Sequence, residues 1–412
     1  MRSELDRLMK AADLDALLVR GAAQHNAPMT YFTGLRHMSA GYLLKKVDQE
    51  PILYCRNMER EEAAASGYET HLLDDFNYTA LLKEAEGDDN LVNAIILSRI
   101  FEKHGVRGRL AIYGKLASEA VWGTYKALEA QYKDIEIVAE NPFENVISDA
   151  RKTKDEGEIE RIRAMGKITT AVVADVAGFL TSHEARGGVL VDRHGDPVLI
   201  GDLKKKIDLW LAMRGAANPK GVIFAPGRDA GIPHSAGRDD QPIPIGQPIV
   251  FDIFPCEAGG GYYYDFTRTW CLGFATEQVD RLYQDVLEVY ENIYASLVAD
   301  TPCRDYQIKT CELFNSRGHP TVLTDETTMD GYVHSLAHGI GLDVHEAPWF
   351  HHSDTNHDLL LPGSVITVEP GLYYPEQDMG VRIEDTVRIT SDGKPETLVE
   401  YPKDLVLKVP GV

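Results

Sequence analysis

The sequence predicts an α+β protein with two domains, and three observations predict it. The chain has 412 residues, and domains usually hold roughly 100–200 residues each. Its first part alternates helical and strand-like segments, whereas its second part concentrates strand signals in residues 247–271 and 364–390. A polar segment, Arg151–Arg163, lies at the change of pattern. We therefore predict an α/β domain at residues 1–147 and a second domain at 148–412.

The first domain is predicted to begin with a helix that runs into a strand over residues 3–20, with Ser3 as a possible cap of the helix. Strands follow near 41–46, 51–55, 109–113 and 135–139. Helical periodicity predicts helices near 57–66, 77–105 and 117–133.

The second domain is predicted to begin with a long helix over about 155–181. Residues 184–202 are rich in Gly, Asp and Arg and indicate a surface insertion, for which a small hairpin is expected. Further helices are expected at 203–214, 276–299 and 304–317.

Composition excludes several classes of function. The net charge of −22 disfavours phosphate backbones and anionic membranes, so we expect no nucleic-acid or membrane partner. Five cysteines without a C-x-x-C pair predict neither a disulfide framework nor a thiolate zinc site. The N-terminus is charged and lacks the apolar core of a signal peptide. No segment was expected to reach the ~20 apolar residues of a membrane span, and a cytoplasmic location follows.

Two aspartates lie in neighbouring strand-like segments. Asp252 lies in the apolar run Pro248–Pro255, and Asp265 lies in Tyr262–Trp270, after a turn with three consecutive glycines. A single aspartate at a strand end usually caps a turn. Two acids within otherwise apolar strands fit that role less well, because a buried polar group needs a partner. A hairpin of the two segments would bring the aspartates towards each other.

Two glutamates lie in a second pair of strand-like segments. Glu369 lies in Ser364–Tyr374, and Glu384 lies in Gly380–Ile389. At a period of two, Arg382 and Glu384 share one face of the second strand. An ion pair with an arginine would explain the polar face without any further function, and a role as a metal ligand is the alternative.

Three histidines lie in the stretch Tyr332–Pro348, which is otherwise apolar and contains a Gly-x-Gly turn. They are His334, His338 and His345, at intervals of four and seven positions. A lone histidine is more often structural than a ligand, but three in one such stretch indicate a site.

Four buried carboxylates close to one another would repel, and two divalent cations would cancel their charge. Four carboxylates and one imidazole form a hard, oxygen-rich set that suits Mn²⁺ or Co²⁺, with Zn²⁺ or Fe²⁺ as alternatives. Two ions ~3.5–4 Å apart can activate a water molecule and stabilise a developing oxyanion. The sequence therefore predicts a two-metal hydrolase with the ligands Asp252, Asp265, His338, Glu369 and Glu384.

These residues resemble the pita-bread metallopeptidases, which include methionyl aminopeptidase, proline dipeptidase and aminopeptidase P. In that family two Asp, one His and two Glu bind a dinuclear metal centre in the chain order seen here. The surrounding strings are also similar: Asp265-Phe-Thr-Arg-Thr269, His338-Gly-Ile-Gly341, Val344-His-Glu346, Glu369-Pro-Gly371 and Arg382-Ile-Glu-Asp385. The resemblance implies a pita-bread fold for the second domain.

The N-terminal domain resembles that of creatinase and of the proline-directed branch of the family. The branch's Tyr-Leu-Thr-Gly string appears here as Tyr31-Phe-Thr-Gly34. Methionyl aminopeptidases usually lack such a domain, so the resemblance implies an Xaa-Pro aminopeptidase or Xaa-Pro dipeptidase. It also implies a homodimer, because this domain often takes part in dimer formation in the branch.

The resemblance implies a role for several side chains. Glu369 is expected to carry a proton between the attacking water and the leaving amine, besides binding metal. His345 is expected to hydrogen-bond the scissile carbonyl or the tetrahedral intermediate. His234 and His334 are expected to line the pocket. Arg382 is expected to orient Glu384 or a substrate carboxylate.

The sequence departs from the family pattern at three places. Asp252 is followed by Ile-Phe where the family usually has Asp-x-Gly, and it stands thirteen positions before Asp265. The tyrosines of Tyr262–Tyr264 were expected to add bulk to the pocket wall. The string Trp349-Phe-His-His352 stands where many prolidases carry an arginine that grips the carboxylate of a dipeptide. This last departure leaves open whether dipeptides or longer peptides are cleaved.

Cleavage of peptides with proline in second position is the function that the sequence predicts. Another small-molecule hydrolase or lyase on the same metal site is the first alternative. A non-catalytic binding module is a second, although it would have little reason to keep all five ligands. Metal-free chemistry like that of creatinase is disfavoured, since creatinase lacks most of these ligands.

Overall fold

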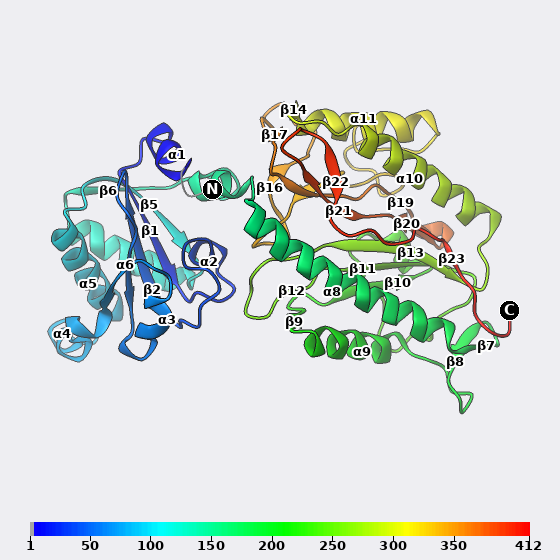
Figure 1. Ribbon diagram of the computed structural model, residues 1–412, viewed down its shortest axis with the longest axis horizontal. Helices are drawn as coiled ribbons and strands as arrows, with labels where there is room; N and C mark the ends of the chain where they lie inside the picture. The colour runs from blue at the N-terminus through cyan, green and yellow to red at the C-terminus, as the bar shows by residue number, and fades with distance from the viewer. Residues whose placement is uncertain (1–3) are drawn as a thin grey trace. The chain divides into compact units, whose positions relative to one another are not determined.

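The computed structural model describes residues 4–412, so Ser3, the expected cap, lies outside the described residues. The chain divides into two compact units. One comprises the described residues up to Arg151 together with Gly259–Gly261, and the other comprises Lys152–Ala258 and Tyr262–Val412. Both units mix helices and strands, as expected for the α+β class (Figure 1).

A six-stranded mixed sheet forms the centre of the N-terminal unit, in the order β4-β3-β2-β1-β5-β6. β1 pairs antiparallel with β2 and parallel with β5. The strands are β1 (Ala16–Gly21), β2 (Gly41–Lys46), β3 (Ile52–Cys55), β4 (Glu69–Leu72), β5 (Gly108–Gly114) and β6 (Ile135–Val138). The α-helices are α1 (Leu5–Ala11), α2 (Ala27–Thr33), α3 (Arg60–Ala64), α4 (Tyr78–Glu84), α5 (Asp89–His104), α6 (Ser118–Gln131) and α7 (Val146–Arg151).

Local signals set the ends of several helices in this unit. The Asp88 side chain accepts hydrogen bonds from the first turn of α5, and Gly105 ends the helix with φ 59°. The sequence predicted no element at residues 27–33, where the structure has α2. That helix has a proline in its first turn and ends at Gly34 with φ 69°, but its seven residues are too few to show a clear helical period.

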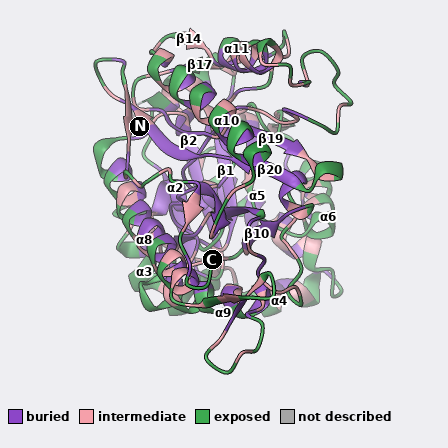
Figure 2. Cartoon of the chain, turned by 90° about the vertical axis from the view of Figure 1, so that its right-hand side faces the viewer, coloured by how far each residue is buried: buried purple, intermediate pink, exposed green. Residues whose placement is uncertain are grey.

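The second unit is layered. Helices α8 (Glu156–Thr181) and α9 (Ile200–Met213) lie on one side of its central strands, and α10 (Glu277–Ser296) and α11 (Cys303–Ser316) lie on the other (Figure 1). The strands are buried, whereas the outer faces of the helices are exposed (Figure 2). Apolar side chains of α10, α11 and the strands beneath them form the largest cluster of this core.

Two sheets form the centre of this unit, with the orders β10-β11-β13-β23 and β16-β15-β18-β21-β22. The first contains β10 (Val222–Pro226), β11 (Pro248–Ile253), β13 (Phe266–Leu272) and β23 (Val406–Leu407). The second contains β15 (His338–Gly339), β16 (Glu346–Trp349), β18 (Val365–Val368), β21 (Asp385–Ile389) and β22 (Pro395–Thr397). Four short pairs complete the unit: β7 (Glu184–Arg186) with β8 (Val189–Val191), β9 (Ala216–Ala217) with β12 (Cys256–Glu257), β14 (Thr301–Pro302) with β17 (Leu359–Leu360), and β19 (Gly371–Tyr374) with β20 (Met379–Arg382).

Helix α8 begins with a capping box formed by Asp155 and Glu158. Its buried residues recur at helical spacing along one face, which packs against α9 and β13. By length and a mean hydropathy of 1.2 it would also be long and apolar enough to cross a membrane. Such a helix is more often the core helix of a globular unit, and its one-sided burial fits that role.

Two segments predicted to be continuous strands are each broken in the middle. Residues 364–374 form β18 and then β19, and residues 380–389 form β20 and then β21. β18 pairs with β21, and β19 pairs with β20, so the two segments pair twice and in different sheets. Pro370 has no N–H for a ladder, and the N–H of Glu384 donates to Thr267 at 3.1 Å. The breaks therefore fall at Glu369 and Glu384.

The insertion at residues 184–202 contains the predicted hairpin, formed by β7 and β8. Residues 192–196 make a turn closed by the Asp192 side chain, which accepts from the N–H groups of His194 and Asp196. Helix α9 begins at Ile200, three residues before the predicted start.

Candidate metal centre

The first two acids come from the antiparallel pair β11–β13. Asp252 lies in β11 opposite Thr267, and Asp265 directly precedes β13. The predicted hairpin therefore brings Asp252 and Asp265 to the same end of the sheet. The carboxylate of Asp265 also accepts a hydrogen bond from the N–H of Phe266 at 2.9 Å, which fixes its orientation.

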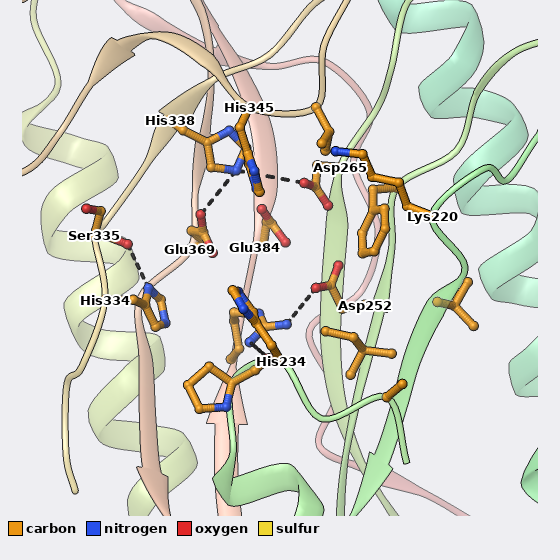
Figure 3. A pocket seen from close by; sticks show the side chains of 17 residues that line it. Lys220, His234, Asp252, Asp265, His334, Ser335, His338, His345, Glu369 and Glu384 are labelled. Carbon is orange, nitrogen blue, oxygen red and sulfur yellow. Dashed lines mark hydrogen bonds and ion pairs between the residues drawn. The ribbon is translucent and has the colours of Figure 1, made fainter. Parts of the chain in front are cut away.

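The two glutamates and the histidine come from the neighbouring strands. Glu369 and Glu384 lie at the two strand breaks, and His338 lies in β15, which pairs with β18. An isolated bridge between Thr267 and Glu384 joins the two sheets at this point. The hydroxyl of Thr267 donates to Glu384 Oε2 at 2.6 Å. The five predicted ligands thus lie around one position (Figure 3).

The His338 ring is oriented so that one nitrogen faces the acids. Its Nδ1 lies 3.0 Å from the carbonyl of Gly339. A carbonyl can only accept, so Nδ1 carries the proton and the lone pair belongs to Nε2. Nε2 lies 3.3 Å from Glu369 Oε1 and 3.8 Å from Asp265 Oδ2. This arrangement is typical of a metal-ligating histidine held by a backbone carbonyl.

Three overlapping groups of side chains could each hold a cation, with ligand atoms within 4.8 Å of one another. The groups are Asp252, Asp265 and Glu384; His338, Glu369 and Glu384; and Asp265, His338 and His345. Asp252 Oδ1 and Glu384 Oε1 are buried without a hydrogen-bond partner among the described residues. Unpartnered buried carboxylate oxygens are costly, and a divalent cation would satisfy both. The donor set therefore fits the two hard cations predicted from the sequence.

Mutual repulsion of the acids appears in their pKa values. Burial, followed by the neighbouring acids, holds the pKa of Asp265 and of Glu384 well above their usual range. Burial raises the pKa of Glu369 to about 8, against the opposing charge of Arg382. Burial also lowers the pKa of His338 to about 3, so this ring is neutral. Protons therefore occupy Asp265, Glu369 and Glu384 where cations are absent, and cations must displace them.

Arg382 is buried beside the acids. Its guanidinium makes an ion pair with Asp252 at 2.6 Å and donates to the Tyr373 hydroxyl at 2.8 Å. Among the described residues it makes no hydrogen bond to the Glu384 side chain, which it was expected to orient. Instead it donates to Thr267 at 3.2 Å, and Thr267 in turn binds Glu384. Hydrogen bonds therefore connect Arg382 to Glu384 through Thr267.

The site opens into a pocket of about 420 Å³ that the five candidate ligands line. His234 and His334 line it, as expected, and so does His345. The ring of His334 lies 2.8 Å from the Tyr373 hydroxyl, and the rings of His338 and His345 meet edge to face at 4.3 Å. The remaining lining residues were not predicted as site residues: Lys220, Val222, Ile223, Pro233, Ala236, Phe254, Ser335 and Val344.

The expectation that Tyr262–Tyr264 form part of the pocket wall is wrong. All three tyrosines are buried, and none lines the pocket. The hydroxyl of Tyr262 donates to Glu158 of α8, and the Tyr264 ring lies against Gly166 of the same helix. The three rings pack into the core, and Phe254 is the aromatic residue of the described wall.

The raised pKa values predict how pH affects the metal-free protein. Between about pH 6.5 and 8, folded Glu369, Asp265 and Glu384 keep protons that the unfolded chain has lost, so stability falls as pH rises. The lowered pKa values of His334 and His338 make stability rise with pH, but only below about pH 6.5. We expect the unfolding temperature of metal-free protein to fall by roughly 3–6 °C across this window.

Thermal unfolding of chelator-treated protein at several pH values measures this dependence. Divalent cations take the place of the protons, so the loaded protein should show a smaller slope. Glu369→Gln removes one titrating group and serves as the control, with a shallower slope in the metal-free state. An unfolding temperature that rises from pH 6.5 to 8 without metal would contradict the assigned protons.

Two family models match the chain. The model of metallopeptidase family M24 matches residues 160–391, and that of the creatinase/prolidase N-terminal domain matches residues 1–152. The Xaa-Pro dipeptidase of Pyrococcus furiosus is 27% identical over 396 residues, covering 95% of this chain and 97% of the relative. A probable dipeptidase of Mycobacterium bovis is 28% identical over 60% of this chain and 59% of the relative.

Solved structures share the whole fold. The prolidase from Pyrococcus horikoshii has a TM-score of 0.71 at 24% identity, covering 98% of this chain and 99% of that chain. An X-Pro aminopeptidase from Thermotoga maritima has a TM-score of 0.72 at 22% identity, covering 98% of this chain and 100% of that chain. The prediction of a pita-bread domain preceded by a creatinase-like domain is thereby confirmed.

Proposed function

Because the chain belongs to metallopeptidase family M24 and carries a creatinase/prolidase N-terminal domain, we propose that it removes the N-terminal residue from peptides with proline in second position. The observation that carries the proposal is the convergence of four carboxylates and one imidazole on one pocket. Relatives described as Xaa-Pro dipeptidases support the preference for proline. Residues 1–147 would form the accessory domain and 148–412 the catalytic domain.

Two divalent cations would be held by the predicted ligands Asp252, Asp265, His338, Glu369 and Glu384. The hard donor set favours Mn²⁺ or Co²⁺, with Zn²⁺ or Fe²⁺ as alternatives. When bound, the cations would polarise the scissile carbonyl and lower the pKa of the attacking water.

The chain's own residues would supply the proton transfers and the orientation of the substrate. Glu369, which lines the pocket, would accept a proton from the attacking water and pass it to the leaving amine. Burial, followed by the charge of Lys220, lowers the pKa of His345, so a neutral imidazole would donate to the carbonyl oxygen as charge develops there. His234 and His334 would line the subsites, and Arg382 would hold Asp252 and, through Thr267, Glu384.

The pocket wall is suited to a proline ring. Val222, Ile223, Pro233 and Phe254 offer apolar surface beside the charged centre, and a proline side chain gains from burial against such surface. Proline also lacks an N–H, so it leaves no donor unsatisfied there.

Two further features belong to the proposal. A homodimer is expected from the resemblance of the N-terminal domain. A cytoplasmic location fits five buried cysteines that form no disulfide among the described residues.

The test is an assay of metal-stripped protein reloaded with Mn²⁺, Co²⁺ or Zn²⁺. An X-Pro dipeptide and an X-Pro tripeptide are offered side by side. Cleavage of the dipeptide makes the enzyme a dipeptidase, and cleavage of the tripeptide alone makes it an aminopeptidase. If protein with bound metal cleaves neither, the proposal fails in favour of a small-molecule hydrolase or lyase.

A further inference from the structure

One cation of the pocket has no carboxylate partner. Lys220 lines the pocket and is exposed, and among the described residues no carboxylate oxygen lies within 4 Å of its ammonium. Arg382, the other strongly basic side chain of the wall, is buried and paired with Asp252 at 2.6 Å. An unpaired ammonium beside four acids is free to bind an anionic group that enters the pocket.

The backbone fixes where this ammonium can reach. Lys220 stands two residues before Val222, which begins β10 and pairs with Ile253 of β11, next to Asp252. Its side chain points towards the acids from the same side of the pocket as His345, whereas His334 and Ser335 lie on the opposite side (Figure 3). Lys220 and His345 both line this pocket.

The candidate metal ligands are buried at the floor of the pocket, and Lys220 is exposed at its edge. The ammonium and carboxylate ends of a dipeptide stand about two residues, roughly 7 Å, apart. When the peptide bond lies over the candidate metal ligands, the carboxylate end can lie within reach of the Lys220 ammonium. Opposite charges that face each other across a site fix the register of a ligand.

We propose that Lys220 binds the C-terminal carboxylate of the substrate and so makes the enzyme a dipeptidase. This inference rests on the proposed function. No arginine is present in residues 349–352, and none of these residues lines the pocket, so Lys220 supplies the cation that the family pattern would place there. A tripeptide carries its carboxylate one residue further out, about 3.5 Å away, and gains less from the same ammonium.

The experiment compares a dipeptide with its C-terminal amide. Metal-loaded wild-type enzyme and the variants Lys220→Met and Lys220→Arg are assayed on an X-Pro dipeptide and on X-Pro-amide, which lacks the negative charge. The wild-type enzyme should prefer the free carboxylate. Lys220→Met should reduce this preference, the ratio of the two kcat/KM values, by roughly tenfold and mainly through KM. Lys220→Arg should retain most of it, because the cation is kept.

Inhibition by the product gives a second readout that involves no turnover. Free proline should inhibit the wild-type enzyme more strongly than prolinamide does, and Lys220→Met should remove the difference. Lys205→Met is the matched control, because Lys205 is exposed on α9 and pairs with Asp202. The ratio of kcat/KM for the dipeptide to kcat/KM for the amide should be the same in Lys205→Met as in the wild type. Metal content should be the same in all variants.

Each failure has a distinct signature. Cleavage of dipeptide and amide at equal efficiency by the wild-type enzyme, or an unchanged ratio in Lys220→Met, would overturn the role of Lys220 and leave the proposed function intact. Cleavage of neither substrate by wild-type enzyme with bound metal would overturn the proposed function, and the role of Lys220 with it.

Discussion

Asp265→Asn is expected to abolish both metal binding and peptidase activity. Asp265 belongs to two of the three candidate ligand groups, and its Oδ2 lies 3.8 Å from His338 Nε2. Asparagine keeps the shape but removes the charge that holds a hard cation, and its amide nitrogen cannot act as a ligand. We expect metal affinity to fall by more than roughly 100-fold, since even losses around the ligands cost 10- to 100-fold.

Metal content after dialysis and peptidase activity measure the effect together. The variant should still fold, because it loses one of several mutually repelling acids. Asp240→Asn is the control, since Asp240 is exposed and lies outside the pocket. A variant that retains the same metal content as the wild type would remove Asp265 from the ligand set.

His345→Ala is expected to keep the metal and lose rate. His345 lines the pocket beside His338 but is exposed at its opening. If its imidazole donates to the carbonyl oxygen in the transition state, its loss should lower kcat by roughly 10²–10³-fold with little change in KM. Metal content should stay at the wild-type value.

His345 also belongs to one of the candidate ligand groups, so metal content decides between the two roles. Loss of one cation in His345→Ala would make it a ligand instead of a hydrogen-bond donor. His357→Ala is the control, because His357 is exposed and outside the pocket. An unchanged rate with unchanged metal would remove His345 from the mechanism.

The sequence predicts the centre of the site better than its wall. Asp252 and Asp265 stand out because each interrupts an apolar strand, and a hairpin needs only local pairing to bring them together. The strand breaks at Glu369 and Glu384 were missed, because the apolar residues around them continue the period of two. What breaks the second strand is the bond from the Glu384 N–H to Thr267, more than a hundred positions away, and no local pattern contains it.

The residues of the pocket wall were also missed, because no local sequence pattern identifies them. Lys220 is one exposed lysine in a loop, and nothing in its neighbours distinguishes it from other surface lysines. Tyr262–Tyr264 were assigned to the wall by their position near Asp265, but their rings fill space against α8. Helix α2 is too short to show a period, although Gly34 marks its end.

The strand breaks also have a mechanical consequence. Asp252 and Asp265 belong to the sheet of β11 and β13, whereas His338, Glu369 and Glu384 belong to the strands of the neighbouring sheet. A cation bound by both groups of ligands would cross-link the two sheets. This cross-link would form only after both sheets have folded. Occupancy would then govern how long the unit resists proteolysis as well as whether it can catalyse, and metal starvation in a cell would shorten the lifetime of the protein along with its activity.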